Sequence, residues 1–325
     1  MHARSKALLS IVVISFLSPP LFATGRVPLT PKFSVGQVVR YRIESTIKTT
    51  GKTTSPIVNP EGGSQSSGAI HMQVRLEVLS VATDGKIRLR AVYEKSSAES
   101  ETDALDLTAR PFEARFNSLE GRTFEFTLGS DGSVTNVQDL TAAVSGDSSK
   151  ALTPELSWLP EVISSENVPQ KGAAVGEKWK SEKPVPGALL AGLLSRSEST
   201  YLRNEPCGVS STENSAAAGS ATPAPSSEDC AVILTQFEIS RSGSPHSDAT
   251  PEDYRRNGLR TSGAWNGTGE SLDSISLVTG LLVSSTQSST QQMDYQVAST
   301  STGSAIHHTG KTQSQTQITL VPAQP

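Results

Sequence analysis

The longest regular pattern in the chain is an alternation of apolar and polar residues over positions 33–48. Because successive side chains of a strand point to opposite faces, this alternation predicts a half-buried antiparallel β-strand. At ~3.3 Å per residue the strand would be roughly 50 Å long, so we expect it to curl or to carry a bulge. Its apolar positions are Phe33, Val35, Val39, Tyr41, Ile43 and Ile47.

Two β-hairpins are predicted next, each with an Asp-Gly pair at its turn. The first joins residues 72–78 to 87–93 through Asp84-Gly85, and the second joins residues 123–128 to 133–137 through Asp131-Gly132. Asp-Gly supplies the positive φ that a tight hairpin turn requires. We therefore assign these two aspartates to turn formation and not to catalysis.

The remaining pattern predicts more strands and few helices. Four long strands rich in Ser, Thr and Gln are expected at 232–239, 262–277, 281–297 and 303–320. Thr153 and Thr250 are each followed by Pro-Glu and would open short helices, the first bent or cut at Pro160. Residues 189–194 are apolar and predict either a helical turn or a buried corner. The predicted fold is mainly β with minor α, a long curved antiparallel sheet or half-barrel covered by a few short helices.

The domain organisation is predicted from the segments in which the strand pattern is absent and from a short repeat in the sequence. We expect one large β domain over residues 24–325, with flexible loops at 49–69 and 208–229. A short internal echo places a Val-Gly pair before an aromatic strand entry at Gly36 and again at Gly176. This echo suggests two related halves, about 30–145 and 170–320.

The first residues have the features of a secretory signal peptide. Arg4 and Lys6 precede the apolar run 7–17, and a Pro-Pro pair and a small residue follow it. We predict a signal peptide over residues 1–23 with cleavage between Ala23 and Thr24. The alternative is a membrane anchor, which needs ~20 apolar residues, and Pro19-Pro20 ends the run too early. The mature protein is therefore expected in the periplasm or secreted, without a transmembrane segment.

The two cysteines fit this oxidising location. Cys207 and Cys230 flank a Ser, Ala, Gly and Pro-rich tract, which predicts a disulfide closing the base of a loop. A bridge over a loop of this length stabilises by ~3 kcal/mol in the chain-entropy account. Two unrelated buried thiols are the alternative.

The charge balance argues against a nucleic acid partner. The net charge of the whole chain is −4, and loss of Arg4 and Lys6 with the leader makes it −6. Binding a phosphate backbone needs clustered Lys and Arg.

The sequence contains few candidate catalytic or ligand-binding groups. The chain has neither a Gly-x-Ser-x-Gly turn nor a Walker or Rossmann glycine loop, and its carboxylates are scattered. Adjacent His307 and His308 on a strand point to opposite faces and cannot hold one ion together. His71 and His246 remain, the latter within reach of Asp248. We predict no catalytic residue, no cofactor and no metal site.

Two further features of the sequence each have a structural and a functional interpretation. The tryptophans, Trp158, Trp179 and Trp265, favour core or sheet-end packing, with a sugar-binding platform as the alternative. Asn266-Gly267-Thr268 is a formal glycosylation acceptor.

Several segments together resemble an uncharacterised family of secreted bacterial proteins, the domain of unknown function catalogued as 6263. The likeness covers residues 33–297, and it lies in SVGQVVRYR, TDGKIRLRAVYE, LEGRTFEFTLGSDGSVTNV, AAVGEKWKSE and GESLDSISLVTGLLVSS. A more distant, architectural likeness is to the curved β-sheet carriers of lipoprotein localisation. The chain departs from the family by lacking a lipid-attachment cysteine, and the resemblance implies no catalytic residues.

Three functions are compatible with these expectations. The first is a non-enzymatic protein that binds an amphiphile, such as a lipid, or a protein segment on a concave apolar sheet face. The second is a structural or surface-interaction protein of the cell envelope that uses polar strand faces and an edge strand. The third is a hydrolase with an unrecognised site.

Overall fold

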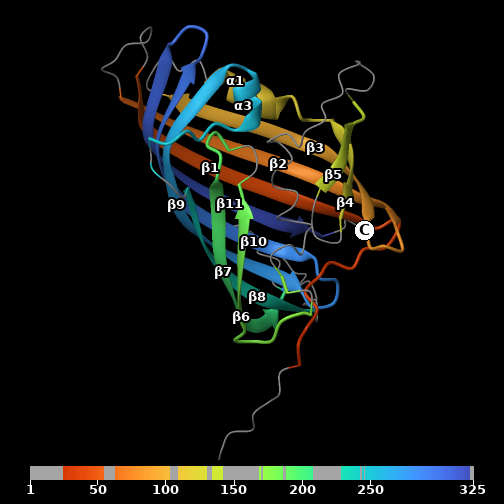
Figure 1. Ribbon diagram of the computed structural model, residues 1–325. Coiled ribbons are helices and arrows are strands. Elements are labelled where there is room, and N and C mark those ends of the chain that lie inside the picture. Colours follow the sequence, from red (N-terminus) through yellow and green to blue (C-terminus); the bar gives the residue numbers. More distant parts are fainter. Residues whose placement is uncertain are drawn as a thin grey trace, which may run out of the picture.

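The computed structural model describes residues 25–54, 63–102, 109–129, 134–141, 168–169, 171–185, 188–207, 228–241, 244 and 246–322. Within these residues the chain forms one antiparallel sheet and two short helices (Figure 1). The elements are β1 (Val38–Thr54), β2 (Gly63–Val81), β3 (Ile87–Thr102), α1 (Ala109–Asn117), β4 (Thr123–Leu128), β5 (Val134–Asp139), β6 (Lys178–Pro184), β7 (Leu193–Pro206), β8 (Asp229–Arg241), α3 (Glu252–Arg256), β9 (Leu259–Ser276), β10 (Leu282–Ser299) and β11 (Ala305–Val321). The predicted fold class, mainly β with minor α, is confirmed.

The eleven strands are ordered β5-β4-β3-β2-β1-β11-β10-β9-β8-β7-β6. Strands β1 to β5 form one meander and strands β6 to β11 form a second. The two meanders meet where β1 pairs with β11 over fifteen residues, from Arg40↔Val321 to Thr54↔His307. Strands β5 and β6 are the two edges.

The sheet is strongly curled, as the length of its strands predicts. In Figure 1 the green strands β6 and β7 pass in front of the orange strands β1 and β2. Register shifts interrupt the β2–β3, β4–β5, β7–β8 and β9–β10 pairings. Such bulges bend a strand and increase its twist, so they contribute to the curl.

One face of the sheet, which we call the core face, carries the apolar side chains. The larger cluster lies mainly on β1 to β4 and is completed by Phe116 of α1, Leu119, Leu282 of β10 and Ile318 of β11. Its fully buried members include Tyr41, whose hydroxyl donates to the carbonyl of Leu282, 3.1 Å away. A smaller cluster joins Leu29, Ala173, Tyr201, Ala231 and Ile233. The opposite face is called the outer face below.

The Val-Gly echo in the sequence corresponds to a turn that occurs twice with the same hydrogen bonds. Gly36 has φ of 80° and donates to Val78, and Gly176 has φ of 85° and donates to Tyr201. Gly121, with φ of 78°, makes a third turn of this kind by donating to Tyr93. Only glycine adopts this φ without strain, which explains its place before β1, β4 and β6. The division into two related halves stays a prediction.

Two predictions at the ends of β1 were wrong. Residues 33–37 do not begin the strand, because the turn at Gly36 precedes Val38. Residues 49–54 and 63–69 are not loop, because β1 and β2 continue and pair from Thr49↔Ser66 to Lys52↔Gly63. The backbone ladder needs no apolar alternation, so Thr, Ser and Gly extend the hairpin after the apolar pattern ends.

The other local predictions had mixed outcomes. The hairpin at Asp84-Gly85 is confirmed, since Asp84 caps its turn by accepting from the backbone of Lys86 at 3.2 Å. The four C-terminal strands and the helix after Thr250 are confirmed as β8 to β11 and α3. Residues 189–192 form a turn with Leu190 buried, and residues 193–194 begin β7 with Leu193 buried, so neither alternative for 189–194 describes the whole segment. Strand β7 and helix α1 were not predicted. The turn at Asp131, the helix at Thr153 and the cleavage site at Ala23-Thr24 lie outside the described residues.

Cys207 and Cys230 form a disulfide with their Cα atoms 5.0 Å apart. The bridge joins the end of β7 to the start of β8, which is the pairing expected from the sequence. The tract from 208 to 227 lies outside the described residues.

Candidate functional site

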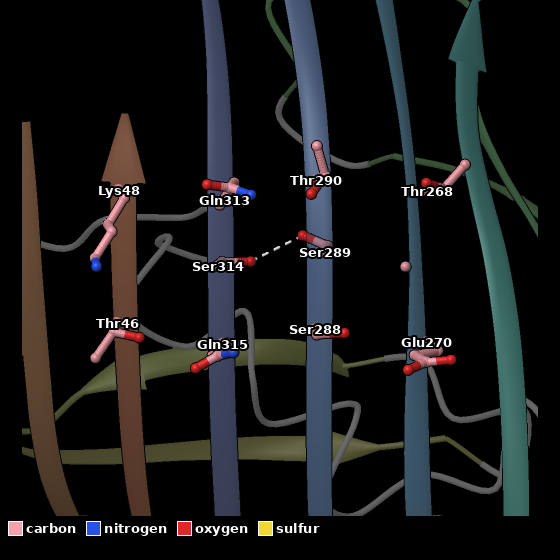
Figure 2. A pocket seen from close by; sticks show the side chains of 11 residues that line it. Thr46, Lys48, Thr268, Glu270, Ser288, Ser289, Thr290, Gln313, Ser314 and Gln315 are labelled. Atoms are coloured by element: carbon pink, nitrogen blue, oxygen red, sulfur yellow. Dashed lines mark hydrogen bonds between the residues drawn. The ribbon is translucent and has the colours of Figure 1, made fainter. Parts of the chain in front are cut away.

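A continuous trough crosses the outer face of the sheet. Its first part, of about 490 Å³, lies over β1, β11, β10 and β9 (Figure 2). A second part, of about 680 Å³, continues over β9, β8, β7 and β6. The two parts share Thr268 and Gly269, so we treat them as one feature, the cross-strand trough.

The register of the strands builds the trough from two parallel rows of outward side chains. One row is Thr46, Gln315, Ser288, Glu270, Gln236, Glu198 and Lys180, and the other is Lys48, Gln313, Thr290, Thr268, Glu238, Arg196 and Glu182. The floor is the row between them, which includes Gly269, Ser289 and Ser314. Since neighbouring residues of a strand point to opposite faces, the floor residues direct their side chains to the core face.

The first part of the trough is lined by hydroxyl and amide groups. Figure 2 shows Gln313 and Gln315 between the hydroxyls of β1 and β10, with Lys48 at one side and Glu270 at the other. Lys48, Glu238 and Glu270 make no hydrogen bond or ion pair with any residue that the structure describes. Among the described residues, these three charges therefore have no partner.

The second part of the trough is lined by paired charges. Glu198 accepts from Lys178 at 3.2 Å and lies 3.3 Å from Lys180, and Arg196 donates to Glu182 at 2.6 Å. Hydrogen bonds from the two lysines hold the pKa of Glu198 below its usual range. All of these side chains are well exposed, so the pairs contribute little stability.

The core face behind the trough is also polar over much of its area. Hydroxyl pairs join neighbouring strands at Ser45–Thr316 (2.9 Å), Thr49–Thr312 (3.1 Å), Ser289–Ser314 (2.8 Å), Ser199–Thr235 (2.8 Å) and Ser181–Ser197 (2.8 Å). The core face is therefore apolar in one part and polar in another, and a concave apolar binding face stays a prediction. The two buried clusters hold the main groups of apolar residues on this face, and Phe237, Ile239 and Met293 lie on it outside the clusters, partly exposed.

Asp273 is an exception on this face, because it is a carboxylate next to the apolar clusters. It accepts from Ser285 at 2.6 Å and from Ser271 at 3.1 Å. Burial raises the pKa of Asp273, and the two hydroxyl donors oppose that shift. No charged partner of Asp273 is found among the described residues.

The histidines are not brought together. His307 lies 2.7 Å from Asp294, whereas the Nδ1 of His308 lies 2.9 Å from the hydroxyl of Thr53 on the core face. The two rings therefore point to opposite faces, as predicted. Asp248 contacts Thr250, Arg255 and Arg260 and not His246. Within the described ranges no three His, Cys, Asp or Glu side chains are placed to hold a metal ion.

The two described tryptophans occupy different surroundings. Trp179 packs against the smaller apolar cluster. Trp265 is partly exposed on the core face of β9, where its ring lies beside that of Tyr295. Trp158 is outside the described residues. Asn266 is exposed on β9, on the outer face.

No helix among the described residues is long and apolar enough to cross a membrane. No family model matches the chain, and no curated protein matches it. Among solved structures, an outer membrane channel from Pseudomonas putida F1 aligns with it at 7% identity over 90% of this chain and 97% of that chain, with a TM-score of 0.20. At this TM-score the alignment says nothing about the function of the chain.

Proposed function

We propose that the protein is a non-enzymatic, extracytoplasmic protein of the cell envelope that binds a partner protein along the cross-strand trough. The disulfide between Cys207 and Cys230 and the signal-like first 23 residues support a location outside the cytoplasm. The resemblance to a secreted bacterial family points to the same location.

The observation that carries the proposal is the lining of the trough. Two rows of side chains cross seven strands and offer hydroxyls, amides and charges but no aliphatic side chain on the outer face. A polar surface with donors and acceptors of both kinds fits a polar protein segment. Lys48 at one end would pair with a carboxylate of the partner, and Glu238 and Glu270 would pair with its basic groups.

The same lining favours this reading over binding of an amphiphile. An acyl chain needs a continuous apolar surface, which the two rows of the trough lack, and the main groups of apolar residues of the sheet are packed into buried clusters. Uptake of a hydrophobic dye by delipidated protein, displaced by fatty acid, would support the amphiphile instead. Turnover in a screen of esters, glycans and peptides would support the hydrolase.

The proposal is tested by placing a photo-activated cross-linking residue at Gln313 of the trough, in the protein expressed in its host. The control is Gln317, which has the same residue type on the same face of β11 but lies outside the trough. We expect one discrete adduct with an envelope protein at position 313 and none at position 317.

Charge reversal then links the adduct to the trough. Lys48→Glu and Glu270→Lys should each reduce the yield of the cross-link, because they invert unpaired charges that the partner would meet. Equal yields at 313 and 317, or no adduct at either, would contradict the proposal.

A further inference from the structure

A row of aromatic side chains lies on the core face, on the opposite side of the sheet from the trough. It is formed by Trp265 of β9, Tyr295 of β10 and His308 of β11, which we call the aromatic row. The ring centroids of Trp265 and Tyr295 are 6.2 Å apart with planes 13° from parallel, and those of Tyr295 and His308 are 5.2 Å apart. All three side chains are partly exposed. Three adjacent strands thus present ring surface to solvent.

Glycines surround the row on the same face. Gly51 and Gly310 pair across β1 and β11, and Gly267 lies on β9 two residues from Trp265. A Cβ atom at Gly310 would lie 3.1 Å from the Nε2 of His308, and one at Gly51 would lie 3.4 Å from its Cε1. The His308 ring therefore leans over the glycine pair. Glycine within a strand weakens it and marks places of close approach. Because these glycines have no side chain, nothing projects from their positions beside the rings.

Hydrogen-bonding groups stand directly beside the rings. The indole nitrogen of Trp265 donates to the side-chain carbonyl of Gln291 at 3.0 Å, which leaves the amide nitrogen of Gln291 to donate elsewhere. The Nδ1 of His308 is engaged by Thr53, and its Nε2 makes no hydrogen bond with a described residue. Burial lowers the pKa of His308, which favours the neutral ring at pH 7.

We propose that the aromatic row binds a neutral oligosaccharide. A sugar ring has a face of C–H groups that packs on an aromatic ring, and hydroxyls at its edge that need donors and acceptors in the same plane. The row offers ring surface together with Gln291, His308 and the Thr49–Thr312 hydroxyl pair. At ~4.8 Å between strands the three rings extend on the order of 10 Å, which suits a short oligosaccharide.

An acyl chain fits the same place less well. Met293 of β10 lies opposite Trp265 and Ile306 of β11 lies two residues from His308, so the aliphatic surface beside the row is small. The other neighbouring positions on this face are polar or glycine, namely Gln291, Gly310, Thr312, Thr49 and Thr53. Ordering a lipid chain there would remove the Gln291 amide and the Thr49 and Thr312 hydroxyls from water without new partners. A sugar satisfies these groups.

The test is isothermal titration of the full-length protein with chitotetraose, cellotetraose and maltotetraose, each as a separate probe. We expect at least one of them to bind. Trp265→Ala should weaken that binding at least about 10-fold, whereas Trp265→Phe, which keeps an aromatic face, should stay within about 3-fold. Gln317→Ala, on the outer face and outside the trough, is the control and should leave the affinity unchanged.

A second variant keeps the test informative if Trp265→Ala does not fold. Gln291→Met retains the size of the side chain and removes the amide, and it should weaken binding several-fold. The inference is overturned if none of the three oligosaccharides binds, or if the aromatic and amide variants bind as tightly as the parent. It is also overturned if fatty acid binds instead and loses affinity on Trp265→Phe and Trp265→Ala alike. None of these outcomes bears on cross-linking at Gln313, so the trough is judged separately.

Discussion

The two ends of the long strands differ in chemistry although one hydrogen-bonded ladder runs through both. At the apolar end, Tyr41, Val74, Leu89 and Phe126 are buried on the core face. At the polar end, the same face carries Thr49, Thr312 and the aromatic row, all partly exposed. The backbone ladder maintains the sheet at both ends, but burial of apolar side chains stabilises only one of them. The polar end is therefore free to offer groups to a ligand.

The largest expected effect comes from removing a buried ring at the apolar end. Phe126→Ala should lower the free energy of unfolding by about 3–5 kcal/mol, because the side chain is 1% exposed and leaves a cavity. Gln287→Ala, on the core face of β10 in the polar part, should cost less than about 1 kcal/mol. Urea unfolding of the two variants measures the difference. Similar losses would mean that the two ends are equally well packed.

An intermediate effect is expected at Asp273, next to the boundary between the two kinds of surface. Its pKa in the folded protein is raised by burial above the value in the unfolded chain. The ionised carboxylate therefore costs stability at neutral pH, and this cost disappears as the pH falls through the raised pKa. Asp273→Asn retains an acceptor for Ser285 and Ser271 and should be more stable than the parent at pH 7.

The measurement for Asp273 is the free energy of unfolding from pH 7 down to pH 3 for parent and variant. The difference in the free energy of unfolding between Asp273→Asn and the parent should shrink as the pH falls. A gain that is absent at pH 7, or one that is constant over this range, would contradict the raised pKa.

The smallest expected effect concerns the hydroxyl pairs of the polar end. Ser289 and Ser314 are 2.8 Å apart across β10 and β11, as the dashed line in Figure 2 shows. A double-mutant cycle with Ser289→Ala and Ser314→Ala should give a coupling of about 0.5–1 kcal/mol. A coupling energy near zero would mean that the backbone hydrogen bonds, and not the hydroxyl pairs, hold these strands together.

The sequence predicts those parts of the fold where local chemistry is strong. Asp84-Gly85 between alternating segments identifies a hairpin, and the alternation around Tyr41 identifies its neighbouring strand. Strand β7 was missed because its core-face positions Ser195, Ser197 and Ser199 are polar, so no apolar period marks it. The loop prediction for 49–69 failed for the same reason.

The candidate sites could not be predicted in this way, because both depend on register between strands. Trp265 and Tyr295 are 30 positions apart, and only the β9–β10 pairing places them side by side. The trough needs seven strands in register, from Lys48 to Lys180. In the sequence, Trp265 is unusual because it lies in a Gly-rich strand. That position is compatible with the sugar-platform alternative for the tryptophans but does not favour it over packing.

The pairing of β1 with β11 has a consequence for how the chain is made. The first long strand to leave the ribosome has its final neighbour at the other end of the polypeptide, more than 250 residues later. A molecule that stops before Ala305 would have two separate meanders, each with an open edge in place of the missing seam. The two meanders can therefore join only after β11 has been synthesised.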